Sequence, residues 1–386
     1  QFGKCFPVVI TFFLLTIAGP VAPQPAAAQH IVSLKVSEPA CSLPPAAFEG
    51  KRVVTAPARK RQKSATISVN FLSSGSLSGN SCKPWTQQAK NAFLRAAGTW
   101  EGLLDSTVPI EVEACWSDDL ATNTLGSAGP ISVVFGGSPI PNTWYPLALA
   151  NAIEGQDLSS TYSEIRAVFN ASRTDWYYGD DANGISSGEL DFETVVLHEL
   201  AHGLGFVGSA NFDDGAGSAE CDGVAGNGCI ESEDSQGNSY PYVFDQVAQD
   251  DAGADLVTFP NPSSDLGTVI TGGSLGNGSG GVFFSGSAVQ GAYGGPAPLY
   301  TPSSWDLGSS YSHWDQSTFP TEVMKPALPS GQALRDPQMA LDLLNDIGWA
   351  QALPVELASF EAVASDGGVT LTWRTATETN NAGFDV

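Results

Sequence analysis

Four short stretches in the first half of the chain have the hydrophobic pattern of β-strands. Residues 66–72 and 110–115 alternate apolar and polar side chains, residues 131–135 form a largely apolar run, and residues 164–169 are a further strand candidate. A period of two indicates a strand with one buried face, whereas a short apolar run indicates a strand buried on both faces. Residues 86–104 instead carry apolar side chains at close to helical spacing and follow Pro84, which predicts a helix.

The stretch between Glu189 and Gly205 has the pattern of a second helix. Leu190, Val195 and Leu197 form an apolar stripe, and acidic side chains lie in the first turn, where they favour a helix start. Gly205 suits the end of this helix, because glycine adopts the left-handed turn that redirects the chain.

The second half of the chain has three distinct patterns. Residues 207–300 are rich in Gly, Ser, Asn and Asp and poor in periodicity, which predicts an insert or subdomain held by turns. Asp336-Pro337 caps a predicted helix that runs to Ile347. Residues 355–363 and 369–373 alternate around a glycine turn and predict a hairpin. Residues 353–386 thereby resemble the start of a fibronectin type III-like module, a truncated β-sandwich fragment of the kind found in secreted bacterial proteins.

The N-terminal sequence predicts export from the cell. Residues 1–29 carry Lys4, an apolar run over 6–18 and a small-residue cleavage site at 26–28, as in a signal peptide. The alternative is a permanent membrane anchor, for which the run is short and followed by prolines. Residues 30–63 then form a pro-segment or linker, and we interpret the basic residues 51–52 and 59–63 as an exposed linker.

Charge and cysteines narrow the class of protein. The 386 residues carry a formal net charge of −25, which makes nucleic acid and anionic membranes unfavourable partners and fits an extracellular protein. The six cysteines include Cys5 in the signal sequence. We expect a disulfide between Cys221 and Cys229 and a second between Cys82 and Cys115, which leaves Cys41 unpaired.

The most informative feature is the motif H-E-x-x-H at residues 198–202. Residues four apart lie on one helix face, so His198 and His202 can bind the same metal ion, and zinc is the metal this pattern favours. Glu199 then falls beside the metal, where its carboxylate can take a proton from water. The alternative is a surface helix that carries two solvated histidines.

A third zinc ligand is expected because catalytic zinc usually has three protein ligands. The commonest metzincin pattern places a histidine six residues after the second, where this chain has Gly208. His313 is the remaining histidine of the mature chain, and Met324 follows it. Two alternatives stay open. In one, a loop histidine stacks on an aromatic ring. In the other, the arrangement is thermolysin-like, and the third ligand is one of the carboxylates Asp213, Asp214 and Asp315.

The motif with its G-F ending, a long insertion, then S-H-W and E-x-M-x-P resembles the leishmanolysin-like branch of the metzincins over residues 64–350. The resemblance implies an α+β fold with a twisted mixed sheet, an active-site helix, and a C-terminal subdomain with a Met-turn and a terminal helix. It implies that His198, His202 and His313 bind zinc, that Glu199 is the general base and that Met324 forms the Met-turn. It also implies that residues 164–169 border the cleft. They would then hold an extended substrate as an added strand, unless they form an ordinary edge strand.

We therefore expect a secreted zinc endopeptidase that acts on proteins or peptides and keeps no membrane anchor after the signal is removed. The alternatives are the thermolysin-like peptidase and an inactive secreted adhesin on the same fold. Calcium is a further candidate ligand, at the acidic residues 213–214 and 231–234, although solvated charge also explains them. Cys41 suggests a latency switch in which its thiolate binds the zinc until the segment is cut.

Overall fold

The computed structural model describes residues 31–36, 41–46, 51–55, 65–216, 220–233, 237, 239–276, 278–350, 357–365 and 368–375. The chain divides into two compact units, one of residues 29–349 and one of residues 1–28 with 350–386. In the second unit, β23 (Leu357–Ser365) and β24 (Gly368–Thr375) pair antiparallel with Phe360 opposite Trp373. The predicted hairpin is confirmed, the fibronectin-like module stays a prediction, and the signal sequence lies outside the described residues.

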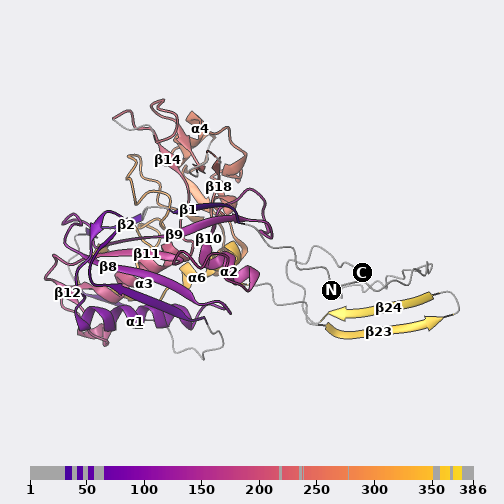
Figure 1. Cartoon of the computed structure of the whole chain (residues 1–386). Helices are drawn as coiled ribbons and strands as arrows, with labels where there is room; N and C mark the ends of the chain where they lie inside the picture. Colours follow the sequence, from indigo (N-terminus) through magenta and orange to yellow (C-terminus); the bar gives the residue numbers. More distant parts are fainter. Residues whose placement is uncertain are drawn as a thin grey trace. The chain divides into compact units, whose positions relative to one another are not determined.

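A mixed β-sheet forms the centre of the larger unit (Figure 1). The order is β1-β9-β11-β8-β5; β5, β8 and β11 run parallel, and β9 runs antiparallel to β11. The fold is thus α+β, as expected. The strands are β1 (Ile31–Val36), β5 (Ile67–Leu72), β8 (Ile110–Ser117), β9 (Gly126–Phe135) and β11 (Ile165–Asn170), and β2 (Cys41–Leu43) and β10 (Tyr145–Pro146) also pair with β9.

One expectation about this sheet is wrong. Residues 164–169 do not lie at an edge, because β11 pairs with β8 on one side and with β9 on the other. Residues 30–63, expected to be a pro-segment or linker, contain strands that pair with the rest of the unit. Strands β1 and β2 pair with β9, β3 (Pro45–Ala46) pairs with β21 (Leu328–Pro329), and β4 (Arg52–Thr55) pairs with β22 (Gln332–Arg335). The basic residues 59–63 lie outside the described residues.

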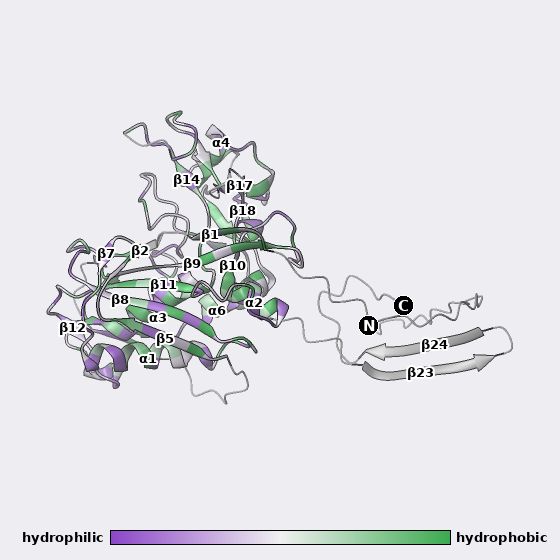
Figure 2. Ribbon diagram, in the orientation of Figure 1, coloured by the Kyte–Doolittle hydropathy of each residue, from purple (hydrophilic) through white to green (hydrophobic). Residues whose placement is uncertain are grey.

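Two helices pack together against the sheet. The indole N–H of Trp100 in α1 (Gln87–Glu101) donates to the carbonyl of Leu197 in α3 (Phe192–Leu204), 3.1 Å away. Helix α3 also lies close to β11, since a Cβ on Gly203 would be 2.4 Å from Cγ2 of Ile165. Figure 2 shows hydrophobic residues along the sheet strands and mixed polar and hydrophobic residues along α1. This packing fixes α3 beneath β9 and β11.

Residues 207–300 form short elements joined by turns, and the disulfide Cys221–Cys229 closes one loop, as predicted. The Asp213 carboxylate accepts backbone N–H bonds from four residues, 220–223. The strands are β14 (Asn211–Phe212), β15 (Gly228–Cys229), β16 (Ser232–Glu233), β17 (Ser239–Tyr240), β18 (Ala248–Asp250), β19 (Val282–Phe284) and β20 (Ala297–Pro298), and the helices are α4 (Ser264–Ile270) and α5 (Ser287–Tyr293).

The other described elements are short. Helix α6 (Gln338–Leu344) follows Pro337 and continues as a wider turn over Asn345–Trp349, close to the predicted bounds. The second predicted disulfide, Cys82–Cys115, ties the end of a small hairpin to β8. The rest are α2 (Leu147–Glu154), β6 (Ser76–Leu77), β7 (Asn80–Ser81), β12 (Trp176–Tyr177), β13 (Leu190–Asp191) and the 3-10 turns Ala182–Gly184, Asp245–Val247 and Leu256–Thr258.

Candidate metal centre

Helix α3 is fixed at both ends. Its N-cap Asp191 accepts the backbone N–H of Thr194 at 3.1 Å and is paired with the guanidinium of Arg335 at 2.6 Å. Its C-cap Gly205 has a φ of 125°, and a Cβ there would lie 2.7 Å from Cδ1 of Ile347. Every residue of α3 is buried, so the alternative of a solvated surface helix is wrong.

The imidazoles of His198, His202 and His313 converge on one point. Their Nε2 atoms are 3.0 Å apart for 198 and 202, 3.1 Å for 198 and 313, and 3.3 Å for 202 and 313. All three side chains are fully buried. In the described part of the chain they are the one group of three or more His, Cys, Asp or Glu side chains close enough to share a metal ion, and no carboxylate belongs to it. The geometry therefore favours three histidines over a carboxylate third ligand.

Backbone carbonyls set the orientation and tautomer of each ring. Nδ1 of His198 lies 2.8 Å from the carbonyl oxygen of Val323. Nδ1 of His202 lies 2.7 Å from that of Phe206, and Nδ1 of His313 lies 2.6 Å from that of Ser309. A carbonyl oxygen only accepts, so each Nδ1 must carry the ring proton and donate. Each Nε2 then presents a lone pair to the centre of the cluster.

Burial keeps these rings neutral. It lowers the pKa of His198 and His202 well below the ordinary value, and it lowers the pKa of His313 to about 4. With no proton on Nε2, the three short contacts cannot be hydrogen bonds between the rings, and their lone pairs face one another. A cation is what such a donor set accommodates. Zinc with three nitrogen ligands at its usual distances separates them by about 3.4 Å, close to the spacing observed. The residues present thus fit a zinc ion.

Glu199 is fully buried beside this cluster, and neither of its carboxylate oxygens has a hydrogen-bond partner in the described structure. Burial raises the pKa of Glu199 well above the ordinary value, and the nearby backbone of Ala128 and Leu43 opposes that rise. Gly126 allows this approach, because a Cβ there would lie 3.1 Å from Cγ of Glu199. A buried carboxyl of raised pKa suits proton transfer.

The segment that follows His313 contacts the histidine cluster. Val323 and Met324 lie in a turn, Met324 is fully buried, and its carbonyl accepts the N–H of Trp314 at 2.8 Å. The carbonyl of Val323 is the partner of His198, so this turn lies directly against the cluster. Residues 323–324 therefore form a turn beside the cluster, and the role of Met324 in a Met-turn stays a prediction.

Several contributors to the site were missed by sequence reasoning. Gly126 and the carbonyls of Phe206, Ser309 and Val323 carry no chemical signature in a sequence, because backbone groups are common to all residues. Leu43 lay in a segment expected to be a pro-segment or linker, for which no contact with the site was predicted. The side chain of Cys41 lies outside the described residues, so its role as a latency switch stays a prediction.

In the part of the structure that is described, the acidic residues of the insert do not form a metal-binding site. The carboxylate of Asp213 is occupied by backbone donors, and no group of three close acidic ligands is found there. Calcium binding stays a prediction without structural support.

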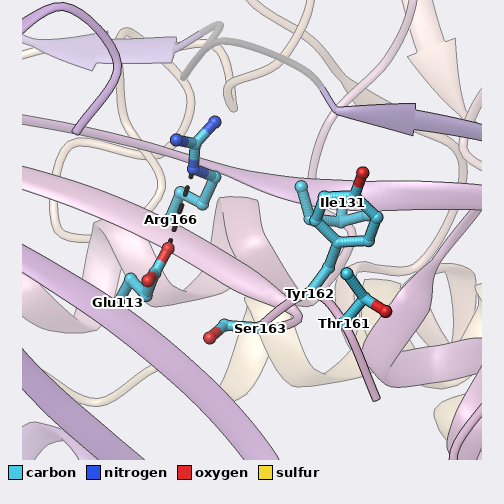
Figure 3. A pocket seen from close by; sticks show the side chains of 6 residues that line it. All are labelled: Glu113, Ile131, Thr161, Tyr162, Ser163 and Arg166. Carbon is cyan, nitrogen blue, oxygen red and sulfur yellow. Dashed lines mark ion pairs between the residues drawn. The ribbon is translucent and has the colours of Figure 1, made fainter. Parts of the chain in front are cut away.

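A small hollow lies elsewhere on the sheet (Figure 3). Arg166 and Glu113, neighbours on β11 and β8, form an ion pair of 4.0 Å beside it. None of the histidines lines it. Its lining residues are Glu113, Ile131, Thr161, Tyr162, Ser163 and Arg166.

Comparisons with known proteins bear on a limited part of the chain. A family model described as SPBPB7E8-like matches residues 111–215, which run from β8 through α3 to the residues after β14. No curated protein and no solved structure matches the chain. Any proposal for the chemistry of the site therefore depends on the geometry of its residues.

Proposed function

We propose that the chain is a zinc-dependent endopeptidase, of the leishmanolysin-like metzincin type, that hydrolyses proteins or peptides. The observation that carries the proposal is the convergence of three neutral imidazole nitrogens within 3.3 Å of one another, beside a buried carboxyl with no partner. A zinc ion on three imidazoles polarises a peptide carbonyl and lowers the pKa of water to about 7.

The chain's own residues account for the remaining steps. The carboxylate of Glu199, whose two buried oxygens have no other hydrogen-bond partner in the described structure, accepts a proton from the attacking water and then gives it to the leaving nitrogen. The carbonyls of Val323, Phe206 and Ser309 hold the three imidazoles in place, so no reorganisation is needed as charge develops.

Export from the cell is part of the same proposal. The two disulfides are compatible with an oxidising compartment, and no helix among the described residues is long and apolar enough to cross a membrane. The N-terminal signal sequence supports this proposal from the sequence alone.

The test is casein hydrolysis by the purified chain, with its zinc content measured in parallel. We expect about one zinc per chain, hydrolysis that a chelator abolishes, and recovery on adding zinc back. Zinc at full occupancy without any hydrolysis would instead favour the inactive adhesin. No zinc at any added concentration would contradict the metal assignment.

A further inference from the structure

A buried carboxylate of the insert joins the two segments that lead to the zinc ligands. Asp245 is fully buried. Its oxygens accept the N–H of Ser209 at 3.1 Å, the hydroxyl of Ser209 at 2.5 Å and the N–H of Tyr242 at 2.7 Å. They also accept the hydroxyl of Tyr311 at 2.9 Å. Ser209 lies in the chain that leaves α3, and Tyr311 lies two residues before His313.

Tyr311 has a backbone conformation that few side chains adopt. Its φ is 70°, in the left-handed region that favours glycine, and another residue keeps such a conformation only where its surroundings hold it. The side chain is fully buried, with its hydroxyl on Asp245. The N–H of Tyr311 donates to the carbonyl of Tyr300 at 2.7 Å, and the N–H of Tyr300 donates to the carbonyl of His313 at 2.8 Å. Side-chain and backbone contacts together therefore fix the turn that leads to His313.

The ring of Tyr311 fills the space beside Gly208. A Cβ on Gly208 would lie 2.1 Å from Cε1 of Tyr311 and 2.8 Å from Oδ1 of Asp245. The N–H of Gly208 also donates to the hydroxyl of Ser312 at 3.1 Å, which is a second link between the two segments. Position 208 is where the commonest metzincin pattern has its third histidine. In this chain, the segment that carries His313 takes up the space at that position.

The same segment sets the ring of His313. Nδ1 of His313 lies 2.6 Å from the carbonyl oxygen of Ser309, and Tyr311 lies between these two residues in the sequence. Nε2 of His313 lies 3.1 Å from that of His198 and 3.3 Å from that of His202. A shift of the turn at Tyr311 therefore changes the distance between His313 and the two histidines of α3.

We infer that Asp245 is a positioning residue for the third zinc ligand, and that it acts through its hydrogen bond with the hydroxyl of Tyr311. The inference rests on the proposed function. Without this hydrogen bond, His198 and His202 keep their own carbonyl partners, whereas the turn before His313 loses the contact that fixes its side chain. The insert then contributes to zinc affinity although it supplies none of the three ligands on α3 and at His313.

The first test measures zinc dissociation constants by competition with a chelator, together with the free energy of unfolding of the zinc-free proteins. Tyr311→Phe keeps the ring and removes the hydroxyl, and we expect it to raise the dissociation constant about tenfold. Gly208→Ala displaces the same ring and should raise it at least as much. Tyr145→Phe is the matched control, because Tyr145 is also buried and its hydroxyl oxygen accepts the N–H of Ile140 at 3.1 Å. This control should bind zinc as the parent does.

Asp245→Asn tests the carboxylate itself. The change keeps the size of the side chain but replaces one acceptor oxygen by an NH2 group, so it should also raise the zinc dissociation constant about tenfold or more. Combined with Tyr311→Phe, it should raise the constant by clearly less than the product of the two single effects, because both variants remove the same hydrogen bond. Fully multiplicative effects would mean that Asp245 does not act through Tyr311, and would overturn the inference.

A His313→Ala background shows whether the effect passes through the third ligand. In that background Tyr311→Phe should change the zinc dissociation constant by less than about twofold, because the side chain that it positions is gone. An equal change in both backgrounds would overturn the inference, since Tyr311 would then support the whole site rather than His313.

The remaining outcomes separate a structural role from positioning, and this inference from the proposed function. A Tyr311→Phe protein that is less stable without zinc, but binds zinc as tightly as the parent, would have lost a merely structural contact, and the inference would fail. If the parent also hydrolyses casein, the proposed function stands without the inference. A parent chain that binds no zinc overturns the proposed function and the inference with it.

Discussion

At the scale of single residues, the candidate site depends on groups that hold one protonation state. Each imidazole donates its Nδ1 proton to a backbone carbonyl, and burial lowers the pKa of the ring, so that a second proton on Nε2 is unfavourable. Glu199 differs from them, because both of its oxygens are buried without a partner. A buried acceptor without a hydrogen bond costs stability, so a carboxyl in this position points to a chemical role.

Replacing Glu199 by Gln tests that role. The change keeps size and shape but removes the base, so we expect peptidase activity to fall by several orders of magnitude, roughly 10³-fold or more, while zinc content and fold are unchanged. Hydrolysis rates and zinc stoichiometry of the two proteins check it. Activity within tenfold of the parent would show that Glu199 is not the base.

Gly126 should control the placement of this base. A methyl group there would meet Cγ of Glu199 at 3.1 Å and Oε1 at 3.2 Å, so Gly126→Ala should move the carboxylate by a few tenths of an ångström and lower kcat about tenfold. Gly136→Ala is the matched control, because a Cβ at that position meets nothing within 4 Å. Equal kcat values for the two variants, measured at full zinc occupancy, would refute this placement.

The histidines could be predicted from the sequence, but their surroundings could not. His198 and His202 share a helix, so local geometry suffices, and His313 followed from the scarcity of histidine and from the resemblance. Gly126 gave no such signal. In a sequence, glycine and proline at positions 126–130 argue against a strand, and the approach of Glu199 that requires glycine is a tertiary contact.

At the scale of elements, the sequence pattern predicted the strands with clear alternation, but it did not predict the order of the strands in the sheet. The expected ranges near β5, β8, β11 and α1 match the structure within a few residues. Alternation shows which face of a strand is buried, but it does not show which strands are its neighbours, so β11 was wrongly placed at the edge. Strands β2 and β3 were missed because prolines at 44 and 45 oppose strand formation; pairing with β9 and β21 overrides that preference.

The start of β11 should make stability depend on pH. Glu164 is held by Nδ2 of Asn151 at 2.8 Å and the N–H of Glu111 at 2.6 Å, and burial raises its pKa to about 7. The folded state thus binds a proton that the unfolded state has lost between about pH 4.5 and pH 7. The contribution of Glu164 to the free energy of unfolding must therefore fall as the pH rises from about 4.5 to about 7.

Glu164→Gln isolates this contribution, because glutamine does not titrate. The unfolding free energy of the parent relative to the variant should decrease between about pH 4.5 and pH 7 and then level off. Urea unfolding of both proteins at matched zinc concentration gives this difference, in which other titrating groups cancel. A difference that rises with pH would mean that the carboxylate is stabilised rather than destabilised by its surroundings.

At the scale of the whole molecule, residues 29–349 fold as one unit in which segments distant in sequence build the site. The Nε2 atoms of His202 and His313 meet across 111 residues, and the insert between them carries its own disulfide. Such non-local contacts are entropically costly to form, because long loops must close before the contacts contribute. Covalent links that shorten the free chain therefore matter for the stability of the unit.

The two disulfides should stabilise the unit unequally. The Cys82–Cys115 bond closes a loop with a sequence separation of 33, and the Cys221–Cys229 bond closes one of 8. Chain entropy assigns about 4 kcal/mol to the longer loop and about 2.5 kcal/mol to the shorter one. The first bond also lies within a small buried cluster with Leu77 and Val168, where its loss removes packing, whereas the second lies within the insert.

Replacing each pair by alanine measures these contributions. We expect the Cys82→Ala, Cys115→Ala double variant to lose more unfolding free energy than the Cys221→Ala, Cys229→Ala variant, by about 1 kcal/mol or more. Urea unfolding of the oxidised, zinc-loaded proteins tests the order. A reducing agent should lower the stability of the parent chain toward that of the variants and leave a variant that lacks the four disulfide-bonded cysteines unaffected. An equal or larger loss from the short loop would show that the insert, rather than the link between the β6–β7 hairpin and β8, limits the stability of the unit.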